Sequence, residues 1–152
     1  MSDVKQYLMW WLLIKHLWDF SKLQPELSDV DVRAGAKKPK DPYPCMEIIW
    51  DSEDGFSLYK TEKGELNLWI DLWIRNDNKD PSAAYEVMAD LMERVCTVLV
   101  RWSDTLLKER KISTNIDVKD AISDAETNRP LIGTRMIIKI EWRKSRYERI
   151  QT

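Results

Sequence analysis

Residues 81–110 read PSAAYEVMADLMERVCTVLVRWSDTLLKER. Apolar residues recur in this stretch at alternating steps of three and four, a spacing that places them on one stripe of a helix. The stripe consists of Tyr85, Met88, Met92, Val95, Leu99, Trp102 and Leu106, and it is widened by Ala84, Leu91 and Val98. The helix is expected to begin after Asp80, a suitable N-cap, with Pro81 in its first position, and to end near Arg110. The stretch therefore predicts a long helix that packs one face on the core.

The segment before this helix, residues 65–75, alternates strictly between two sets of side chains. Leu66, Leu68, Ile70, Leu72 and Ile74 alternate with Asn67, Trp69, Asp71, Trp73 and Arg75. Such alternation predicts a strand with one buried face. The second face carries Trp69 and Trp73, for which two interpretations stay open. The two rings are core if a second helix, such as the N-terminal one, covers that face, and otherwise they form an exposed docking patch.

The remaining stretches predict further strands and loops around this pair. Strands are expected at residues 29–34, 45–51 and 135–142, and weaker strand signals lie at 56–61 and 112–122. Turns are expected at 52–55 and 62–64, and a charged tail is expected to start at about residue 143. Residues 35–44 contain three prolines together with Lys37, Lys38 and Lys40, so they should form an extended basic surface loop. Because helices and strands do not alternate regularly, the sequence predicts an α+β fold, a mostly antiparallel sheet packed by a long helix and an N-terminal helix.

The N-terminal segment, residues 2–22, is expected to form a helix that is apolar on more than one side. One stripe contains Val4, Leu8, Trp11, Lys15 and Trp18, and another contains Tyr7, Trp10, Ile14 and Leu17. A helix of this kind is buried on two sides. One side would cover the sheet, and the other requires either a second element of the same chain or a neighbouring subunit. The unbroken apolar run is too short for a membrane span of about 20 residues, so no membrane partner is expected.

The composition is typical of a globular protein. The chain has 152 residues, of which 43% are hydrophobic and 33% are charged, with a formal net charge of −2. These values favour a single domain over residues 1–152 and argue against a protein that grips nucleic acid, which is usually basic. Eight tryptophans are many for this length, and tryptophan is enriched in cores and in interface hot spots. Cys45 and Cys96 are expected to be reduced, mostly buried thiols.

Residues with catalytic chemistry are sparse. His16 is the single histidine and lies in the apolar N-terminal helix, where packing is expected rather than catalysis. The four glycines lie in separate turns, so they form no phosphate-binding loop. The acidic residues Glu47, Asp51, Asp71 and Glu141 offer a small metal-dependent nuclease as an alternative function, although their spacing matches no nuclease signature. The sequence therefore predicts no enzyme, no cofactor and no metal site.

Taken together, residues 2–143 resemble the tail-terminator, or tail-completion, family of long-tailed bacteriophages and related prophage particles. The resemblance begins with an opening helix (3–23), a Val-x-Val strand (30–32) and a proline-rich loop that leads through Tyr43 and Pro44 into a buried strand (45–50). A long strand (65–75) follows, and after it come a polar loop and a long helix with Ala83, Ala84, Leu91 and Val95. A closing strand (135–142) completes the pattern. The hairpin at 56–64 and the number of tryptophans depart from the family pattern.

The resemblance implies a structural role in the tail or neck of a virion that is assembled in the cytoplasm of the host bacterium. Proteins of this family form a ring, typically hexameric, that caps the tail tube, ends tube polymerisation and presents a surface for the head-completion, or neck, protein. DNA only passes through the channel of the ring. The expected partners are therefore further copies of the chain, the tail tube protein and a neck protein.

The candidate contact residues for such a ring are Trp10, Trp11, Trp69, Trp73, Lys37, Lys38 and Lys40. Two alternatives to a tail terminator stay open besides the nuclease. One is another neck or head–tail connector protein of the same particle, and the other is an adaptor or immunity-type binding protein.

Overall fold

The computed structural model describes residues 8–36, 42–54, 62–78 and 80–144. Its elements in chain order are α1 (Met9–Lys22), a short 3-10 helix η2 (Pro25–Leu27), β1 (Asp31–Ala34), β2 (Cys45–Asp54), β3 (Lys63–Arg75), α2 (Pro81–Arg110), β4 (Ile112–Ser123) and β5 (Leu131–Lys144). The helix expected from residue 2 is described from Met9, with Leu8 as its N-cap. The strand expected at 56–61 and the tail after Lys144 lie outside the described residues.

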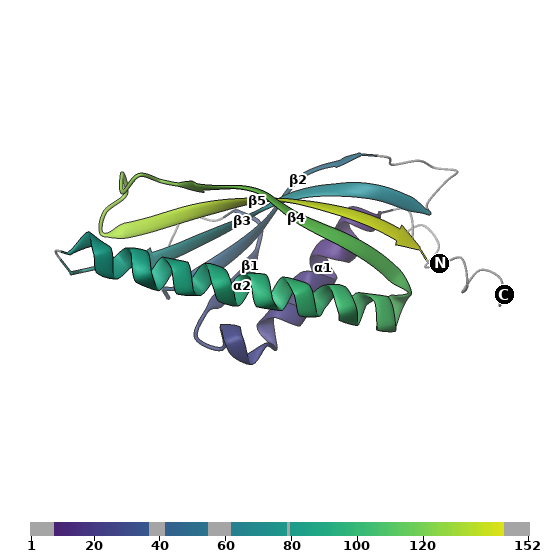
Figure 1. The fold of residues 1–152 in the computed structure, drawn as a ribbon, viewed down its shortest axis with the longest axis horizontal. Coiled ribbons are helices and arrows are strands. Elements are labelled where there is room, and N and C mark those ends of the chain that lie inside the picture. Colours follow the sequence, from purple (N-terminus) through teal and green to yellow (C-terminus); the bar gives the residue numbers. More distant parts are fainter. Residues whose placement is uncertain (1–7, 37–41, 55–61, 79, 145–152) are drawn as a thin grey trace.

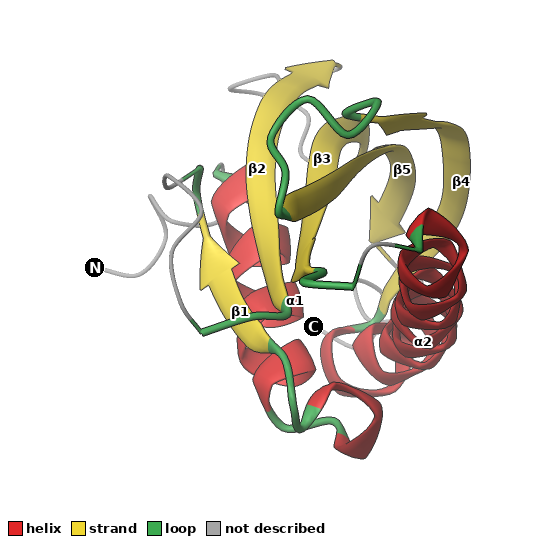
Figure 2. Ribbon diagram, turned by 90° about the vertical axis from the view of Figure 1, so that its left-hand side faces the viewer, coloured by secondary structure: helices red, strands yellow, loops and turns green. Residues whose placement is uncertain are grey.

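The five strands form one mixed sheet with the order β1-β2-β3-β5-β4. β1 and β2 are parallel, and the other neighbouring pairs are antiparallel. β1 and β4 are the edge strands, and β5, the last strand in the described chain, is inserted between β3 and β4 (Figure 2). The predicted α+β fold, a mostly antiparallel sheet packed by a long helix and an N-terminal helix, is confirmed.

Both helices lie on the same side of the sheet (Figure 1). α2 packs against β3 and β4, whereas α1 packs against β1 and β2. The two helices also meet each other, because the Trp102 indole Nε1 donates a hydrogen bond of 3.0 Å to His16 Nδ1. The possibility that the N-terminal helix covers the face of Trp69 and Trp73 is therefore wrong. None of the described helices is long and apolar enough to cross a bilayer.

The core lies between the helices and the sheet face that they cover. Leu66, Leu68, Ile70, Leu72 and Ile74 of β3 are at most 4% exposed, as the alternation predicted. They share the core with the buried face of α2: Ala84, Met88, Leu91, Val95, Val98, Leu99, Trp102 and Leu106. Burial of each large apolar side chain contributes about 1.5–3 kcal/mol, so this two-layer core is the main source of stability.

α2 begins and ends where the sequence predicted. The Asp80 carboxylate caps its first turn by accepting a hydrogen bond of 3.0 Å from the backbone N–H of Ser82, and Lys111 ends the helix in the left-handed region. The predicted stripe also contained Tyr85, which is instead 53% exposed. Residues that repeat every 3.5 positions drift by about 20° per heptad around a straight helix. The first member of the stripe has therefore left the buried face.

Two predicted turns are wrong, and the strands beside them are longer than expected. β2 continues through residues 52–54, because a bulge after Trp50 keeps the strand paired with β3. β3 already includes Lys63 and Gly64, which pair with the end of β5. β5 itself runs to Lys144, beyond the expected start of the tail. Hydrogen bonding across the sheet has outweighed the weak local preference of these polar residues for turns.

Candidate functional site

We call the sheet face that points away from α1 and α2 the open face. Its side chains alternate with the core residues: Cys45, Glu47 and Ile49 of β2, Asn67, Trp69, Asp71 and Trp73 of β3, and Arg135, Ile137 and Lys139 of β5. Within the part of the chain that the structure describes, both helices pack on the opposite side of the sheet (Figure 1). Most of these side chains are nevertheless buried or half-buried, because they pack against one another.

Arg135 organises the centre of the open face. Its guanidinium lies over the Trp69 ring, 3.9 Å from the ring centroid. It also donates two hydrogen bonds of 2.9 Å to the two carboxylate oxygens of Asp71, and these bonds raise the pKa of Arg135. A bidentate ion pair and a cation–π contact together hold the arginine in one orientation. The Trp69 ring under it is therefore an ordered part of the surface.

Trp73 forms the second aromatic contact of the open face. Its neighbour on β5 is Gly133, and the ring covers this glycine so closely that an added Cβ would lie 2.6 Å from the ring carbon Cζ3. Ile122, near the end of β4, is 48% exposed and lines a depression of about 260 Å³ together with Trp73 and Arg135. The open face thus combines two packed tryptophans with an exposed isoleucine.

Two of the acidic residues considered for a metal site, Glu47 and Asp71, are direct neighbours on β2 and β3. Both are buried, with exposures of 2% and 8%. The Arg33 guanidinium lies 3.9 Å from the Glu47 carboxylate, and Arg135 binds Asp71, so each carboxylate faces a cation of its own. Among the described residues, no group of three or more histidine, cysteine and acidic side chains is placed to hold a metal ion.

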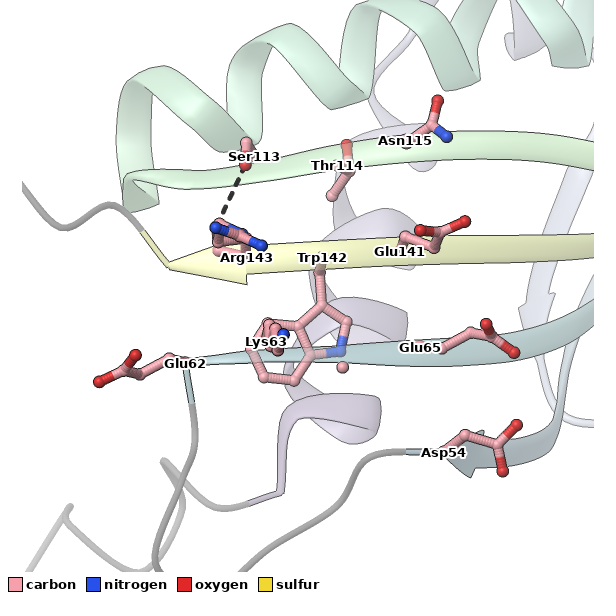
Figure 3. A pocket seen from close by; sticks show the side chains of 11 residues that line it. Asp54, Glu62, Lys63, Glu65, Ser113, Thr114, Asn115, Glu141, Trp142 and Arg143 are labelled. Carbon is pink, nitrogen blue, oxygen red and sulfur yellow. Dashed lines mark hydrogen bonds between the residues drawn. The ribbon is translucent and has the colours of Figure 1, made fainter.

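A pocket of about 620 Å³ lies at the end of the sheet where β3 begins and β5 ends (Figure 3). Its charged lining consists of Asp54, Glu62, Glu65 and Glu141 together with Lys63 and Arg143. Lys139 forms ion pairs of 3.2 Å with Glu65 and 3.5 Å with Glu141, and its hydrogen bond lowers the pKa of Glu65. The Trp142 indole Nε1 is buried and has no hydrogen-bond partner among the described residues. Paired charges beside an aromatic ring suit a contact surface better than acid–base catalysis.

The residues predicted as contacts fall in different places. Trp69 and Trp73 lie together on the open face. Trp10 stacks on Trp50, with ring centroids 4.0 Å apart and planes 10° apart, so much of this ring is used within the chain. Trp11 is 41% exposed on α1. The three basic residues Lys37, Lys38 and Lys40 lie outside the described residues.

One surface that the sequence did not predict is a groove between α2 and the edge strand β4. It has a volume of about 230 Å³ and is lined by Cys96, Leu99, Val100, Ser103, Asp104, Ile116 and Val118. Val100 and Val118 are 67% and 44% exposed. Cys96, expected to be buried, is exposed here, whereas Cys45 is buried and desolvation raises its pKa to about 11. Cys96, Val100 and Leu107 follow helical spacing, a signal that could have predicted a second apolar stripe on α2.

Comparison with known proteins adds no family to this picture. No protein-family model matches the chain, and no curated protein sequence matches it.

Proposed function

We propose that this chain is a structural protein of a long-tailed phage or of a prophage-derived particle. In this role it forms a ring, typically hexameric, that caps the tail tube, ends tube polymerisation and presents the head-joining surface to a neck protein. Two arguments support the proposal. The sequence pattern resembles that of tail-terminator proteins, and the fold carries two surfaces with half-buried or exposed aromatic and aliphatic side chains, which suit contacts with other subunits.

The open face is the observation that carries the proposal. Its two tryptophans, Trp69 and Trp73, are held in place by Arg135 and by the backbone at Gly133. Protein interfaces are enriched in tryptophan and arginine. Side chains that are already ordered lose little conformational entropy when a partner binds. An ordered aromatic surface on one side of a two-layer fold is therefore well suited to bind another subunit.

A ring also requires a second and different surface, because each subunit in a head-to-tail ring contacts its two neighbours through two patches. The groove between α2 and β4, with the exposed residues Val100 and Val118, supplies such a patch. It lies on the helix side of the sheet, because Val118 pairs with the core residue Ile138. The open face and the groove therefore face different directions, and each can serve one neighbour.

The unpaired edge of β4 lies beside this groove and offers a further contact to a neighbouring subunit. β4 is 12 residues long and pairs only on its β5 side within the described chain. The backbone N–H and C=O groups along an unpaired edge readily accept another strand. A neighbouring subunit that covers the groove would also shield this edge.

The proposal is tested by native mass spectrometry of the protein with tail tubes and by electron microscopy of particles. We expect a discrete ring on the tube end, and overlong or headless tails in particles that lack the protein. Trp73→Ser and Val100→Ser should each abolish the ring while circular dichroism shows a folded chain. Val87→Ser, at a side chain on α2 that is 51% exposed and outside the groove lining, is the matched control and should leave the ring intact.

Two results would contradict the proposal. Tails of normal length without this protein would exclude a terminator. Mg²⁺-dependent cleavage of plasmid DNA that is lost in Glu47→Gln would instead support the nuclease alternative.

A further inference from the structure

The outer side of α1 carries an apolar surface on which no described element packs. Leu8, Trp11 and Leu23 are 39%, 41% and 82% exposed. With Leu12 and Phe20 they line a groove of about 530 Å³ beside the C-terminal end of α2. Exposed apolar side chains that gather around one groove mark an interaction site. The question is which partner fits it.

The side chains at the centre of this surface form a symmetric pattern. Trp11, Lys15, Asp19 and the C-cap Leu23 recur every four positions, so they follow one line that winds by about 40° per step around the helix. Apolar residues stand at both ends of the line, and a positive and a negative residue stand between them. Lys15 Nζ lies 2.6 Å from an Asp19 carboxylate oxygen, and both side chains are 48% exposed. The two charges are therefore accessible to a partner.

A second copy of the same helix complements this pattern when it runs antiparallel. Trp11 then lies opposite Leu23 of the partner subunit, and Lys15 lies opposite the partner's Asp19. The two-fold axis repeats each contact, which gives two apolar pairs and two ion pairs. A parallel arrangement would instead place Lys15 against Lys15 and Asp19 against Asp19, and like charges repel.

We propose that two copies of this chain associate through α1 as an antiparallel, two-fold symmetric dimer. The contact uses neither the open face nor the groove at β4, so it is independent of the proposed ring. α1 has 14 residues and is therefore only about 21 Å long. A contact of this length belongs to the small, readily dissociating class of interfaces, so the dimer exchanges with the monomer.

Sedimentation equilibrium of the full-length protein over a concentration series tests this proposal, and we expect a monomer–dimer equilibrium. Lys15→Glu or Asp19→Lys alone should weaken dimerisation roughly tenfold, because two symmetry-related ion pairs become repulsive. The variant with both changes should dimerise like the natural chain, because both pairs are restored with their charges exchanged. Melting curves of each variant separate loss of dimerisation from loss of folding.

The orientation of the two helices is tested by cross-linking in a Cys96→Ser background, which removes the exposed native thiol. Trp11→Cys and Leu23→Cys chains are prepared separately, mixed and oxidised. An antiparallel dimer yields a disulfide-linked product only in the mixture, because two copies of residue 11 are about 18 Å apart in that arrangement.

The same measurements in a Trp73→Ser background distinguish the dimer from the ring, because that change disables the proposed ring and leaves α1 untouched. A monomer at every concentration would overturn the dimer, as would dimerisation that neither single charge exchange weakens. Cross-linking of Trp11→Cys chains with each other would overturn the antiparallel arrangement. Binding to anionic lipid vesicles in place of dimerisation, abolished by Leu23→Ser, would assign the surface to a membrane instead.

Discussion

Replacing Gly133 with alanine tests whether Trp73 is packed as tightly as the open face indicates. Gly133 does not adopt a positive φ, so the backbone itself accepts alanine. The new Cβ, however, would lie 2.6 Å from Cζ3 and 2.8 Å from Cε3 of the Trp73 ring. Ordinary carbon–carbon contacts are about 3.5–4.0 Å long, so the ring must retreat by about 1 Å.

Overpacking of this kind costs about 1–3 kcal/mol, and the lower entropy of the unfolded alanine chain returns about 0.4–1 kcal/mol of it. We therefore expect Gly133→Ala to lower the free energy of unfolding by about 1–2 kcal/mol, measured by urea denaturation. The change should also weaken assembly, because the displaced ring no longer matches its partner surface.

The control is the same substitution in a Trp73→Leu background, where the smaller side chain leaves room for the Cβ. In that background we expect the cost of Gly133→Ala to fall to within about 0.5 kcal/mol of zero. An equal cost in both backgrounds would refute the packing argument, and so would a Gly133→Ala variant as stable as the natural chain.

Three further predictions concern other sites. Gly64→Ala should cost about 1–3 kcal/mol in urea denaturation, because its Cβ would lie 2.8 Å from the Trp142 ring; an equal cost in a Trp142→Leu background would contradict this. Burial raises the pKa of the Glu53 carboxyl above its ordinary value of 4.5, so ionisation of Glu53 destabilises the fold as the pH rises above 4.5. Glu53→Gln should therefore raise the melting temperature at pH 7 but not below pH 4.5, and equal shifts at both pH values would refute this reasoning. Hydrogen bonds from Arg101 lower the pKa of Glu26 from 4.5 to about 2. The ionised Glu26 therefore stabilises the fold above pH 4.5, and this stabilisation is lost as the pH falls through about 2. Glu26→Gln should lower the melting temperature at pH 7 but not near pH 2, and an unchanged melting temperature at pH 7 would disprove the prediction.

The elements with the strongest periodicity were predictable from the sequence. The alternation in β3 and the stripe of α2 arise because one face of each element is buried, and this leaves a local record in the chain. The sequence of a strand does not show which helix covers its buried face. α1 carries enough apolar residues to cover either face of the sheet, and only its contacts, such as that of His16 with Trp102, show that it lies beside α2.

The open face was predictable only in part. Trp69 and Trp73 stand two pleats apart in one strand, so their shared face follows from the sequence. The contact of Arg135 with Trp69 and Asp71 does not follow from the sequence. Arg135 lies 64 positions after Asp71 and reaches it only because β5 is inserted beside β3. The groove at Val100 was missed for a similar reason, since its second wall belongs to β4.

The interior position of β5 in the sheet, between β3 and β4, has a consequence for the biosynthesis of this protein. On the ribosome β1, β2, β3 and α2 emerge before β5, so β3 waits for a neighbour that is among the last described residues to be translated. Until then one edge of β3 is unpaired, and such edges promote aggregation. A chain that stops before residue 131 would keep this edge exposed permanently. A cell that makes many copies of the protein therefore depends on prompt completion of each chain, or on chaperones that shield the nascent sheet.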